Sequence, residues 1–575
     1  MKAKRVADLL VDTLVTAGVR RVYGVAGDSL NGITDSIRPR KDIEWIHLRH
    51  EEAAAFAAGA EAQLTGNLAV CAGSCGPGNL HLINGLFDAH RSRAPVLAIA
   101  AQIPSPEIGG GYFQETHPDQ LFRECSHYAE LISQSEQMPR ILEIAMRTAV
   151  ARQGVAVVAI PGDVSLRAAT EAPSGVTFSE PRPRITPSDG QVSRMVELLR
   201  GAKKVTILAG AGCAGAHDSV VALAQRLGAP IVHTLRGKEY VEYSNPCDVG
   251  MTGLLGFTSG YHAIQAADLL LMLGTDFPYR QFYPTKATII QVDVRGEQIG
   301  RRTPVALGVV GDVGATAEAL LSRLSEARDG RHLTSALADY AKAREGLDAL
   351  ASPGTNESKV HPRFVARVLN ELASEDAIFA CDVGTPTVWA ARYLSMNGRR
   401  RLLGSFNHAS MANALPQAIG AQLTFPSRQV ISMSGDGGLS MLLGELLTLR
   451  QLELPVKVVV FKNDSLAFVD LEMKSAGFLD FATDLTNPNF AALAESAGLL
   501  GLSVTSSEQL APALTKALQH PGPALVEVAV SHQEAVLPPS IDLELVQKFG
   551  LFVVKAVLSG RGDEVVDLAK TNYWR

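Results

Sequence analysis

The chain has 575 residues, of which 46% are hydrophobic and 19% charged, and it carries a net charge of −6 at pH 7. This length predicts several domains, and the composition is typical of an ordered globular protein. A mildly acidic chain without a Lys/Arg-rich tract gives no support for nucleic-acid binding. The cysteines form no CxxC pair, which favours reduced, structural thiols and a cytoplasmic location. No apolar run reaches the roughly 18–20 residues that a membrane-spanning helix needs.

Short apolar runs alternate with longer helical patterns along the chain, which is typical of parallel α/β architecture. Breaker-rich stretches divide this pattern into three consecutive blocks and a tail. We therefore predict an α/β protein with three consecutive open parallel-sheet domains, over residues 1–182, 183–345 and 355–532, and a C-terminal amphipathic tail over residues 533–575. Strands are expected at Leu68–Cys71, Val96–Ile99, Val155–Ile160, Val205–Leu208, Leu269–Leu273, Ile289–Val292, Val430–Met433, Val456–Phe461 and Leu525–Val530.

In the first block, Arg49-His50-Glu51 follows the apolar run Ile43–Leu48 and precedes an alanine-rich helix pattern. The carboxylate has two interpretations. It is either an ordinary acidic residue stabilised by the dipole of a helix N-terminus, or a carboxyl group held in apolar surroundings for acid–base chemistry. The glycine-containing turn Ser74–Asn79 follows in the same block, and a plain connection between a strand and a helix would look the same.

The middle block carries Gly210-Ala211-Gly212 after a predicted strand, which is a weak nucleotide-binding signal because turn glycines are common. Asp293 ends another predicted strand and is well placed to accept ribose hydroxyls, as acidic residues do in dinucleotide-binding folds. Two further segments, Thr252–Leu255 and Thr275–Arg280, follow strand-like runs or turns at the expected sheet edge.

The most informative pattern lies in the third block, where Gly435-Asp436-Gly437-Gly438 follows one apolar run and Asn463 follows the next. Two buried parallel strands would present Asp436 and Asn463 at their carboxyl ends, where open α/β sheets bind ligands. A carboxylate and an amide oxygen suit Mg²⁺, which completes its shell with phosphate oxygens and water. The neighbouring glycines would let the backbone approach a diphosphate closely. The alternative is a plain turn followed by a coincidental asparagine.

Together these motifs resemble the thiamin diphosphate (ThDP) enzymes, in particular the pyruvate oxidase and acetolactate synthase group. Longer stretches also carry the resemblance, among them Arg49–Leu64, Val70–Asp88, Asp382–Tyr393 and Gly404–Pro416. Within that group the chain is similar, tail included, to the quinone-dependent pyruvate dehydrogenases of bacteria, which are peripheral-membrane pyruvate oxidases. The resemblance implies the fold of ThDP enzymes, the cofactors ThDP, Mg²⁺ and FAD, and a homotetramer.

The resemblance also assigns roles to individual residues. Glu51 would activate ThDP, and Met411 would lie between the two rings of the cofactor. Asp436, Asn463 and the carbonyl of Ser465 would bind Mg²⁺. The residues implied to contact ThDP or its metal are Glu51, Ala409, Ser410, Met411, Asp436, Gly437, Gly438, Asn463, Asp464, Ser465, Leu466, Ala467, Phe468 and Val469.

For FAD and the substrate, the implied residues come from all three blocks. Those implied to hold FAD are Thr252, Gly253, Leu254, Leu255, Thr275, Asp276, Phe277, Pro278, Tyr279 and Asp293. Phe113, Val383 and Phe468 match apolar positions around the family's substrate site and would favour a small 2-oxo acid, although each also has a core-packing interpretation.

One departure from the family pattern lies next to the predicted metal site. The family usually has two adjacent asparagines where this chain has Lys462-Asn463. Lys462 either places a cation near the metal, with Asp464 able to offset its charge, or has drifted as a surface-directed side chain.

The tail begins with an apolar run, Phe549–Leu558, that is about half the length needed to cross a membrane. Beyond the break at Gly560-Arg561-Gly562, one helical stripe gathers Val565, Leu568, Ala569 and Asn572. The chain closes with Tyr573-Trp574-Arg575, a combination suited to a membrane interface. These features fit an amphipathic helix in an anionic or phospholipid surface, or a helix docked on the protein body, or both states in turn.

The implied reaction is the oxidative decarboxylation of pyruvate to acetate and CO₂, with electrons passing through FAD to a membrane quinone. The implied location is cytoplasmic, peripheral on the inner face of the cell membrane. An acetolactate synthase-type carboligase with a non-redox FAD is the main alternative, followed by a simple 2-oxo acid decarboxylase and a non-catalytic scaffold. In the family, ThDP lies between the first block of one subunit and the third block of another, so Glu51 and Asp436 would meet across a two-fold interface.

Overall fold

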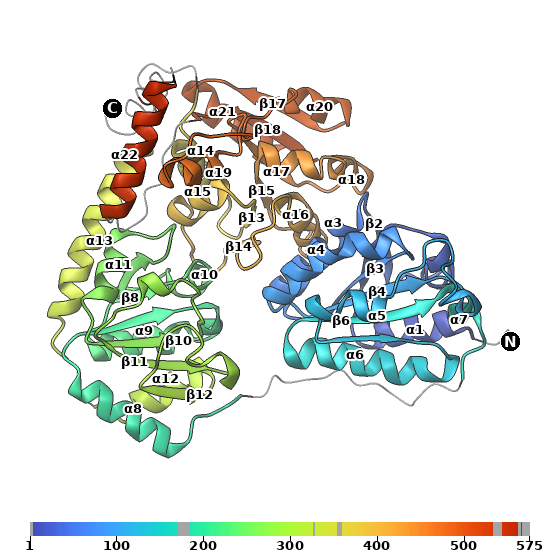
Figure 1. Ribbon diagram of the computed structural model, residues 1–575, viewed down its shortest axis with the longest axis horizontal. Helices are drawn as coiled ribbons and strands as arrows, with labels where there is room; N and C mark the ends of the chain where they lie inside the picture. The colour runs from blue at the N-terminus through green and yellow to red at the C-terminus, as the bar shows by residue number, and fades with distance from the viewer. Residues whose placement is uncertain are drawn as a thin grey trace.

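The computed structural model describes residues 4–170, 184–325, 328–353, 359–532 and 543–559, together with Arg561 and Val565. It contains three sheets of six parallel strands, each built from a consecutive part of the chain and covered by helices (Figure 1). The predicted fold class, three open parallel-sheet α/β domains in succession, is confirmed. Among the helices described, none combines the length and the apolar character that crossing a bilayer requires.

The first sheet has the strand order β2-β1-β3-β4-β6-β5. Its strands are β1 (Arg21–Gly24), β2 (Glu44–His47), β3 (Ala69–Gly73), β4 (Val96–Gln102), β5 (Tyr128–Leu131) and β6 (Val155–Pro161). Its helices are α1 (Val6–Thr16), α2 (Asn31–Ile37), α3 (Glu51–Thr65), α4 (Pro77–Arg91), α5 (Pro118–Leu121), α6 (Met138–Arg152) and α7 (Gly162–Leu166). Every residue of β3, β4 and β6 is buried, as expected for parallel strands covered on both faces.

The second sheet has the order β12-β11-β10-β7-β8-β9. Its strands are β7 (Val205–Ala209), β8 (Ile231–His233), β9 (Asp248–Met251), β10 (Leu269–Leu273), β11 (Thr288–Asp293) and β12 (Leu307–Val310). Its helices are α8 (Asp189–Gly201), α9 (His217–Leu227), α10 (Lys238–Val241), α11 (Thr258–Gln265), α12 (Val313–Leu321) and α13 (Arg331–Leu350). The boundary expected at residue 345 falls inside α13, which continues toward the third sheet.

The third sheet has the order β14-β13-β15-β16-β18-β17. Its strands are β13 (Ile378–Cys381), β14 (Arg401–Gly404), β15 (Val430–Gly435), β16 (Lys457–Lys462), β17 (Leu500–Val504) and β18 (Ala524–Ala529). Its helices are α14 (Pro362–Leu372), α15 (Thr385–Tyr393), α16 (Ala414–Thr424), α17 (Asp436–Met441), α18 (Glu445–Gln451), α19 (Ala467–Ser475), α20 (Phe490–Ser496) and α21 (Ser507–Gln519). Because Gly435 of β15 pairs with Phe461 of β16, the residues that follow both strands emerge at the same edge of the sheet.

Helices α3, α4 and α16 join the first and third domains through unusually close packing. A Cβ atom built on Gly420 of α16 would lie 2.2 Å from the carbonyl oxygen of Ala57 in α3. A Cβ atom on Gly85 of α4 would lie 2.6 Å from the Cβ atom of Ala55. The alanine-rich sequence of α3 therefore serves this approach, and one continuous hydrophobic core extends from the first domain into the third.

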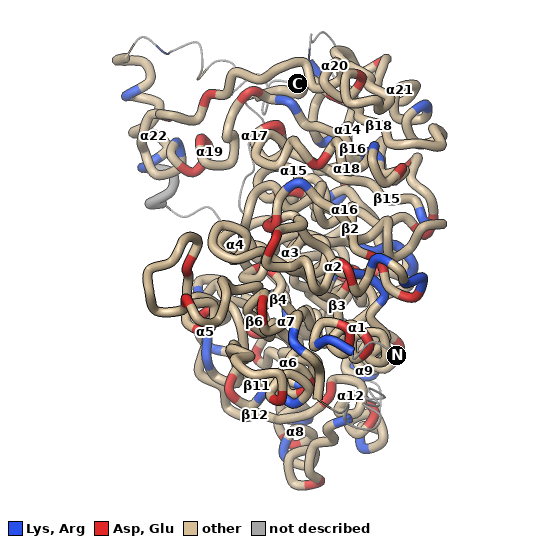
Figure 2. Tube along the Cα trace, turned by 90° about the vertical axis from the view of Figure 1, so that its right-hand side faces the viewer, with Lys and Arg blue, Asp and Glu red and all other residues tan. Residues whose placement is uncertain are grey.

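A last described helix, α22 (Leu543–Leu558), lies beside α19 in both views of the molecule (Figures 1 and 2). The predicted stripe members Leu568, Ala569 and Asn572 and the Tyr573–Arg575 end lie outside the described residues.

The close approach of α3 and α16 predicts that Gly420→Ala destabilises the protein. The added methyl group would overlap the Ala57 carbonyl, and overpacking of this kind costs about 1–3 kcal/mol. We expect a lower midpoint in thermal unfolding. The matched control is Gly346→Ala in α13, where a built Cβ atom meets nothing within 4 Å, so helix propensity should leave stability unchanged or raise it by up to about 1 kcal/mol. Equal midpoints for Gly420→Ala and the wild type would contradict this account.

Candidate active site

Asp436 lies at the carboxyl end of β15 and is only 2% exposed. Its Oδ2 atom accepts hydrogen bonds from the backbone N–H groups of Asn463 and Asp464, at 3.1 and 2.7 Å, and from the side-chain amide of Asn487 at 2.9 Å. Its Oδ1 atom accepts a hydrogen bond from Gly437 at 2.9 Å. Burial raises the pKa of Asp436, while the backbone N–H groups act in the opposite direction. These bonds fix the carboxylate, and Oδ1, with one described donor, keeps a lone pair for a cation.

The oxygen atoms around Asp436 suit a hard cation. The side-chain oxygen of Asn463 accepts only the N–H of Ser465, at 3.1 Å, among the hydrogen bonds described. Asn463 and Ser465 are 7% and 4% exposed, so both are held in fixed surroundings. Carboxylate, amide and carbonyl oxygens are the donors that Mg²⁺ prefers. The residues at this edge therefore fit the predicted metal, and we call Asp436, Asn463, Asp464, Ser465 and Asn487 the Asp436 site.

Sequence reasoning missed Asn487. Its amide donates to Asp436 and also to Asp464 Oδ1 at 3.0 Å, and so connects the two sides of the site. Asp464 has a positive φ of 59°, a backbone conformation that asparagine and aspartate tolerate better than most residues. An isolated bridge between Ser465 and Asp484 brings the distant segment next to the site. No local sequence pattern indicates that Ser465 pairs with Asp484, so Asn487 could not be predicted as a site residue from the sequence.

Lys462 does not face the Asp436 site. Its Nζ atom donates to the carbonyl of Pro488 at 3.2 Å and lies 3.6 Å from a carboxylate oxygen of Glu527. Of the two interpretations of this departure from the family pattern, drift of a side chain directed elsewhere agrees better with the geometry.

The glycines after Asp436 allow other groups to approach the loop. A Cβ atom on Gly437 would lie 3.0 Å from a methyl group of Leu466 and 3.3 Å from the terminal methyl group of Met411. A Cβ atom on Gly438 would lie 1.8 Å from Oδ2 of Asp382, so no other residue fits there without a shift. The structure therefore brings Met411 and Leu466 to the edge of the Asp436 site.

Asp382 is a second buried carboxylate that the site prediction missed. It follows β13, is 1% exposed, and burial raises its pKa to about 7. Backbone N–H groups oppose that rise; they belong to Val383, Ala412, Asn413 and Gly435. Asp382 thus ties the segment that carries Met411 to the end of β15, and places the predicted substrate residue Val383 directly beside this junction.

The segment around Met411 adopts a constrained backbone. Ala409 and Ala412 have positive φ angles of 62° and 68°, which alanine rarely adopts. The Oγ atom of Ser410 accepts a hydrogen bond of 2.7 Å from the amide of Asn84 in α4. The first domain therefore helps to hold the Met411 segment of the third.

Glu51 is the first residue of α3 and is 7% exposed. Its Oε2 atom lies 3.0 Å from Nδ1 of His81, and the His81 ring stacks on His50 with 4.4 Å between ring centres. A Cβ atom built on Gly78 would lie 3.1 Å from Oε1. The predicted turn Ser74–Asn79 thus borders the predicted activating carboxylate, and we call His50, Glu51, Gly78 and His81 the Glu51 site.

The structure does not join all the predicted residues. In the described part of the chain, no hydrogen bond or ion pair connects the Glu51 side chain to the Asp436 site. Phe113 is 79% exposed and Val469, in α19, is 40% exposed, so neither is a core residue of this single chain. Phe468 of α19 packs as a partly buried side chain against the core of the third domain.

The predicted FAD segments meet at the edge of the second sheet. A Cβ atom on Gly253 would lie 3.0 Å from the ring of Phe277 and 3.9 Å from that of Tyr279. Asp293 ends β11, is 2% exposed, and burial raises its pKa. The N–H of Arg295 donates to Asp293 Oδ1 at 2.9 Å. Gly253 and the rings of Phe277 and Tyr279 thus lie together, whereas Leu255 packs against the core of the third domain.

Several buried donors near these segments lack partners among the described groups. They include the hydroxyl of Thr252 and Nη2 of Arg295, whose atoms are buried without a hydrogen bond. Arg93, from the first domain, lies 3.4 Å from Asp276, and burial, with the nearby Arg295, lowers its pKa to about 10. The buried Arg295 nitrogen and the nearby Arg93 suit a phosphate group, and the Thr252 hydroxyl, at the end of a different strand, suits another polar group of a long ligand.

The glycines of Gly210-Ala211-Gly212 have a packing explanation. A Cβ atom on Gly212 would lie 2.6 Å from Cα of Gly274, and the Gly212 N–H donates to the Gly274 carbonyl at 3.0 Å. Close contact between the turns after β7 and β10 is therefore sufficient to require glycine here.

Comparison with protein families covers each of the three domains. Residues 4–121 match the N-terminal TPP-binding domain of thiamine pyrophosphate (ThDP) enzymes, residues 192–320 match the central domain, and residues 382–528 match the C-terminal TPP-binding domain. The chain belongs to the thiamine pyrophosphate enzymes.

Individual relatives of this thiamine pyrophosphate enzyme include proteins of different activity. The protein YdaP of Bacillus subtilis is 36% identical over 99% of both chains. A pyruvate oxidase of Lactiplantibacillus plantarum is 30% identical over 91% of this chain and 88% of its own length. An acetolactate synthase large subunit of Parasynechococcus marenigrum is 31% identical over 92% of this chain and 88% of its own. Identity therefore does not choose between oxidase and synthase.

The geometry of the Asp436 site predicts that one substitution weakens ThDP binding and that a second, nearby substitution leaves it almost unchanged. Asn487→Ala should weaken Mg²⁺-dependent ThDP binding about tenfold or more, because a hydrogen bond to a charged group contributes roughly 1.5–3 kcal/mol. Lys462→Asn should change that affinity by less than about twofold, because Nζ faces Pro488 and Glu527. Titration of the apoenzyme with ThDP at fixed Mg²⁺ measures both. Comparable losses in the two variants would show that the positions are wrongly assigned.

Proposed function

We propose that this thiamine pyrophosphate enzyme oxidises pyruvate to acetate and CO₂ and passes the electrons through FAD to a membrane quinone. The observation that carries the choice is α22, a C-terminal helix that packs on α19, the helix that holds Phe468 and Val469. A carboligase of the acetolactate synthase type gives no reason for such a helix. That carboligase remains the second candidate, because relatives of both kinds share the fold.

Bound ThDP supplies the electron sink that allows a 2-oxo acid to lose CO₂. Glu51 exchanges a proton at Oε1, since His81 lies against Oε2 and the missing side chain at Gly78 leaves room beside Oε1. The Asp436 site would hold Mg²⁺ and the diphosphate, with Asn487 and the backbone of Asp464 orienting the carboxylate. These residues fit the cofactor that the family uses.

The middle domain would hold FAD. Thr252 and Arg295 offer buried N–H or O–H groups that make no hydrogen bond to the residues described, Arg93 adds a cation, and Asp293 would accept hydroxyl groups at the end of β11. Tyr279 and Leu254, which are 39% and 38% exposed, provide apolar surface beside these donors. The donor set suits the diphosphate and ribityl parts of a flavin dinucleotide.

The proposal includes a homotetramer in which the Glu51 site of one chain serves the Asp436 site of another. The exposed Phe113 supports it, because a large apolar side chain at the surface of one chain becomes useful when a second chain covers it. With Val383 and Phe468, it would form an apolar pocket for pyruvate.

The activity is tested by incubating the purified protein with pyruvate, ThDP, Mg²⁺ and a dye acceptor. We expect acetate, CO₂ and reduced dye, with bleaching of the flavin absorbance when pyruvate is added before the dye; acetolactate would favour the carboligase instead. Glu51→Gln should lower kcat by about 10²–10⁴-fold, the usual contribution of proton transfer by a positioned side chain. Glu44→Gln, an exposed carboxylate on β2, is the control and should turn over normally. Near-normal activity of Glu51→Gln would rule out its assigned role.

The tail proposal rests on the contacts between α22 and α19. Phe552 and Ala556 of α22 are fully buried, and the ammonium of Lys474 in α19 lies 5.7 Å from the centre of the Phe552 ring. Lys555 donates to the carbonyl of Gly477 at 2.7 Å. We propose that α22 docks here at rest and moves to an anionic or phospholipid surface when the flavin is reduced, which places the enzyme on the inner face of the cell membrane.

Two variants separate docking from lipid binding. Removal of residues 543–575 should abolish stimulation by phospholipid vesicles while sparing turnover with soluble dye, which should rise without lipid because the docked helix is gone. Phe552→Ala keeps the tail but removes a buried ring, a change that costs roughly 3–5 kcal/mol, so α22 should undock and raise dye turnover without lipid. Leu558→Ala, at a position 82% exposed, should leave that lipid-free turnover unchanged. Full lipid stimulation of the truncated enzyme would refute the proposal.

A further inference from the structure

A glycine-rich loop over residues 108–117 connects the turn at Ser105–Glu107 to α5. Gly109 and Gly111 have positive φ angles of 91° and 71°, and a Cβ atom built on either would meet nothing within 4 Å. Ordering a residue costs roughly 1–2 kcal/mol of backbone entropy, and glycine loses more freedom than other residues. Packing does not supply that free energy to these glycines, so another interaction must hold the loop.

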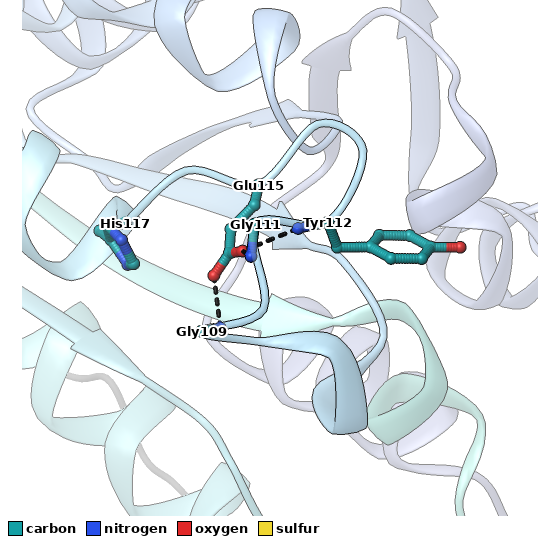
Figure 3. Close-up of a pocket in the computed structure, with 5 residues that line it drawn as sticks. All are labelled: Gly109, Gly111, Tyr112, Glu115 and His117. Atoms are coloured by element: carbon teal, nitrogen blue, oxygen red, sulfur yellow. Dashed lines mark hydrogen bonds between the residues drawn. The ribbon is translucent and has the colours of Figure 1, made fainter.

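Glu115 supplies it. Its Oε1 atom accepts a hydrogen bond from the Gly109 N–H at 2.5 Å, and its Oε2 atom accepts from Gly111 and Tyr112 at 2.7 and 3.0 Å (Figure 3). The Glu115 N–H donates in turn to the Tyr112 carbonyl at 2.9 Å. The three backbone donors lower the pKa of the Glu115 carboxyl, which is therefore ionised at neutral pH. One side chain thus closes the loop on itself.

The other side of the loop is anchored to the turn beside the Glu51 site. Gln114 has a positive φ of 63° and accepts a hydrogen bond of 3.3 Å from the thiol of Cys75. A Cβ atom on Gly76 would lie 2.8 Å from Cβ of Gln114, so this approach requires glycine. Gln102 donates to the carbonyl of Thr116 at 2.5 Å.

Phe113 lies between the two anchors and keeps 79% of its surface exposed. Phenylalanine is normally buried, and a loop with two sets of anchors around one exposed ring is arranged to present that ring. We propose that Glu115 is a positioning residue that preorganises the loop so that Phe113 enters the pyruvate pocket. This inference rests on the proposed function. The Glu115 carboxylate is hydrogen-bonded to backbone N–H groups of its own loop. We therefore expect it to affect pyruvate only through the position of Phe113.

The kinetic consequence follows from the population of the competent loop. If only a fraction of the molecules hold Phe113 in place, the apparent affinity for pyruvate falls by that fraction. Glu115→Ala should therefore raise KM for pyruvate about tenfold, while ThDP and FAD affinities stay within about twofold of the wild type. Glu115→Gln keeps one acceptor oxygen and should give an intermediate KM.

Glu107→Gln is the matched control. Glu107 lies in the adjoining turn and is exposed, and its carboxylate accepts no hydrogen bond among the described residues. The Glu107→Gln substitution removes one negative charge from the same segment as Glu115→Ala does. It should leave the KM for pyruvate unchanged. A rise in KM equal to that of Glu115→Ala would show that charge, rather than the three bonds, is responsible, and would overturn the proposal.

A double-mutant cycle tests whether Glu115 acts through Phe113. In a Phe113→Ala background, Glu115→Ala should raise KM by less than about twofold further, because the ring it positions is already gone. Effects that multiply in full would mean that the two residues act independently, and the positioning role would then be wrong.

Limited proteolysis reports on the loop itself, whatever reaction the enzyme performs. Chymotrypsin cleaves after aromatic residues, and Tyr112 and Phe113 are the targets in this loop. Glu115→Ala should be cleaved here about tenfold faster than the wild type or Glu107→Gln, because proteolysis follows the population of open states. An unchanged cleavage rate overturns the inference about Glu115. Absence of pyruvate turnover by the wild type overturns the proposed function instead.

Discussion

The close contact between α3 and α16 is the constraint on which the rest of the arrangement depends. Gly420 meets the Ala57 carbonyl with no room for a side chain, and the alanines of α3 allow the first and third sheets to share one core. Polar contacts at the rim follow from that approach: the backbone of Arg49 and His50 donates to Glu445, and Asn84 donates to Ser410. The Glu51 site and the Met411 segment are therefore both attached to the shared core, each through a helix of that core.

The elements that could be predicted from the sequence are those that depend on residues close together in the chain. Uninterrupted apolar runs became strands buried on both faces, and the two runs that end before Asp436 and Asn463 became the neighbours β15 and β16. What could not be predicted depends on contacts between distant segments. Asn487 reaches Asp436 only because a bridge pairs Ser465 with Asp484. Asp382 matters because four backbone N–H groups converge on it, and backbone groups leave no trace in a sequence.

Glycines in a turn after a strand can indicate either a ligand site or close packing, and the contacts in the structure distinguish the two. Glycines after β7 suggested a nucleotide turn, but their contact with Gly274 accounts for them by packing alone. The glycines after Asp436 are different, since a carboxylate, a thioether methyl group and a leucine approach that loop from several sides. The contacts of the two residues next to Asn463 in sequence also differ. Asp464 turns toward Asn487 within the site, whereas Lys462 turns to Glu527 outside it.

Large exposed aromatic side chains close to α22 and on the loop at Phe113 add to the argument from α22, because apolar surface of this size is usually covered by a partner. Phe113 is displayed by a loop that Glu115 closes, and Phe478 and Phe481, which are 60% and 81% exposed, follow α19 beside α22. A surface of this kind close to a docked helix is expected where a second chain or a lipid surface completes the protein. The same helix that packs Phe552 inward leaves Val554, Val557 and Leu558 outward, more than half exposed. Among the described residues, docking on α19 therefore covers the face of α22 that carries Phe552, and the face that carries Val554, Val557 and Leu558 stays exposed.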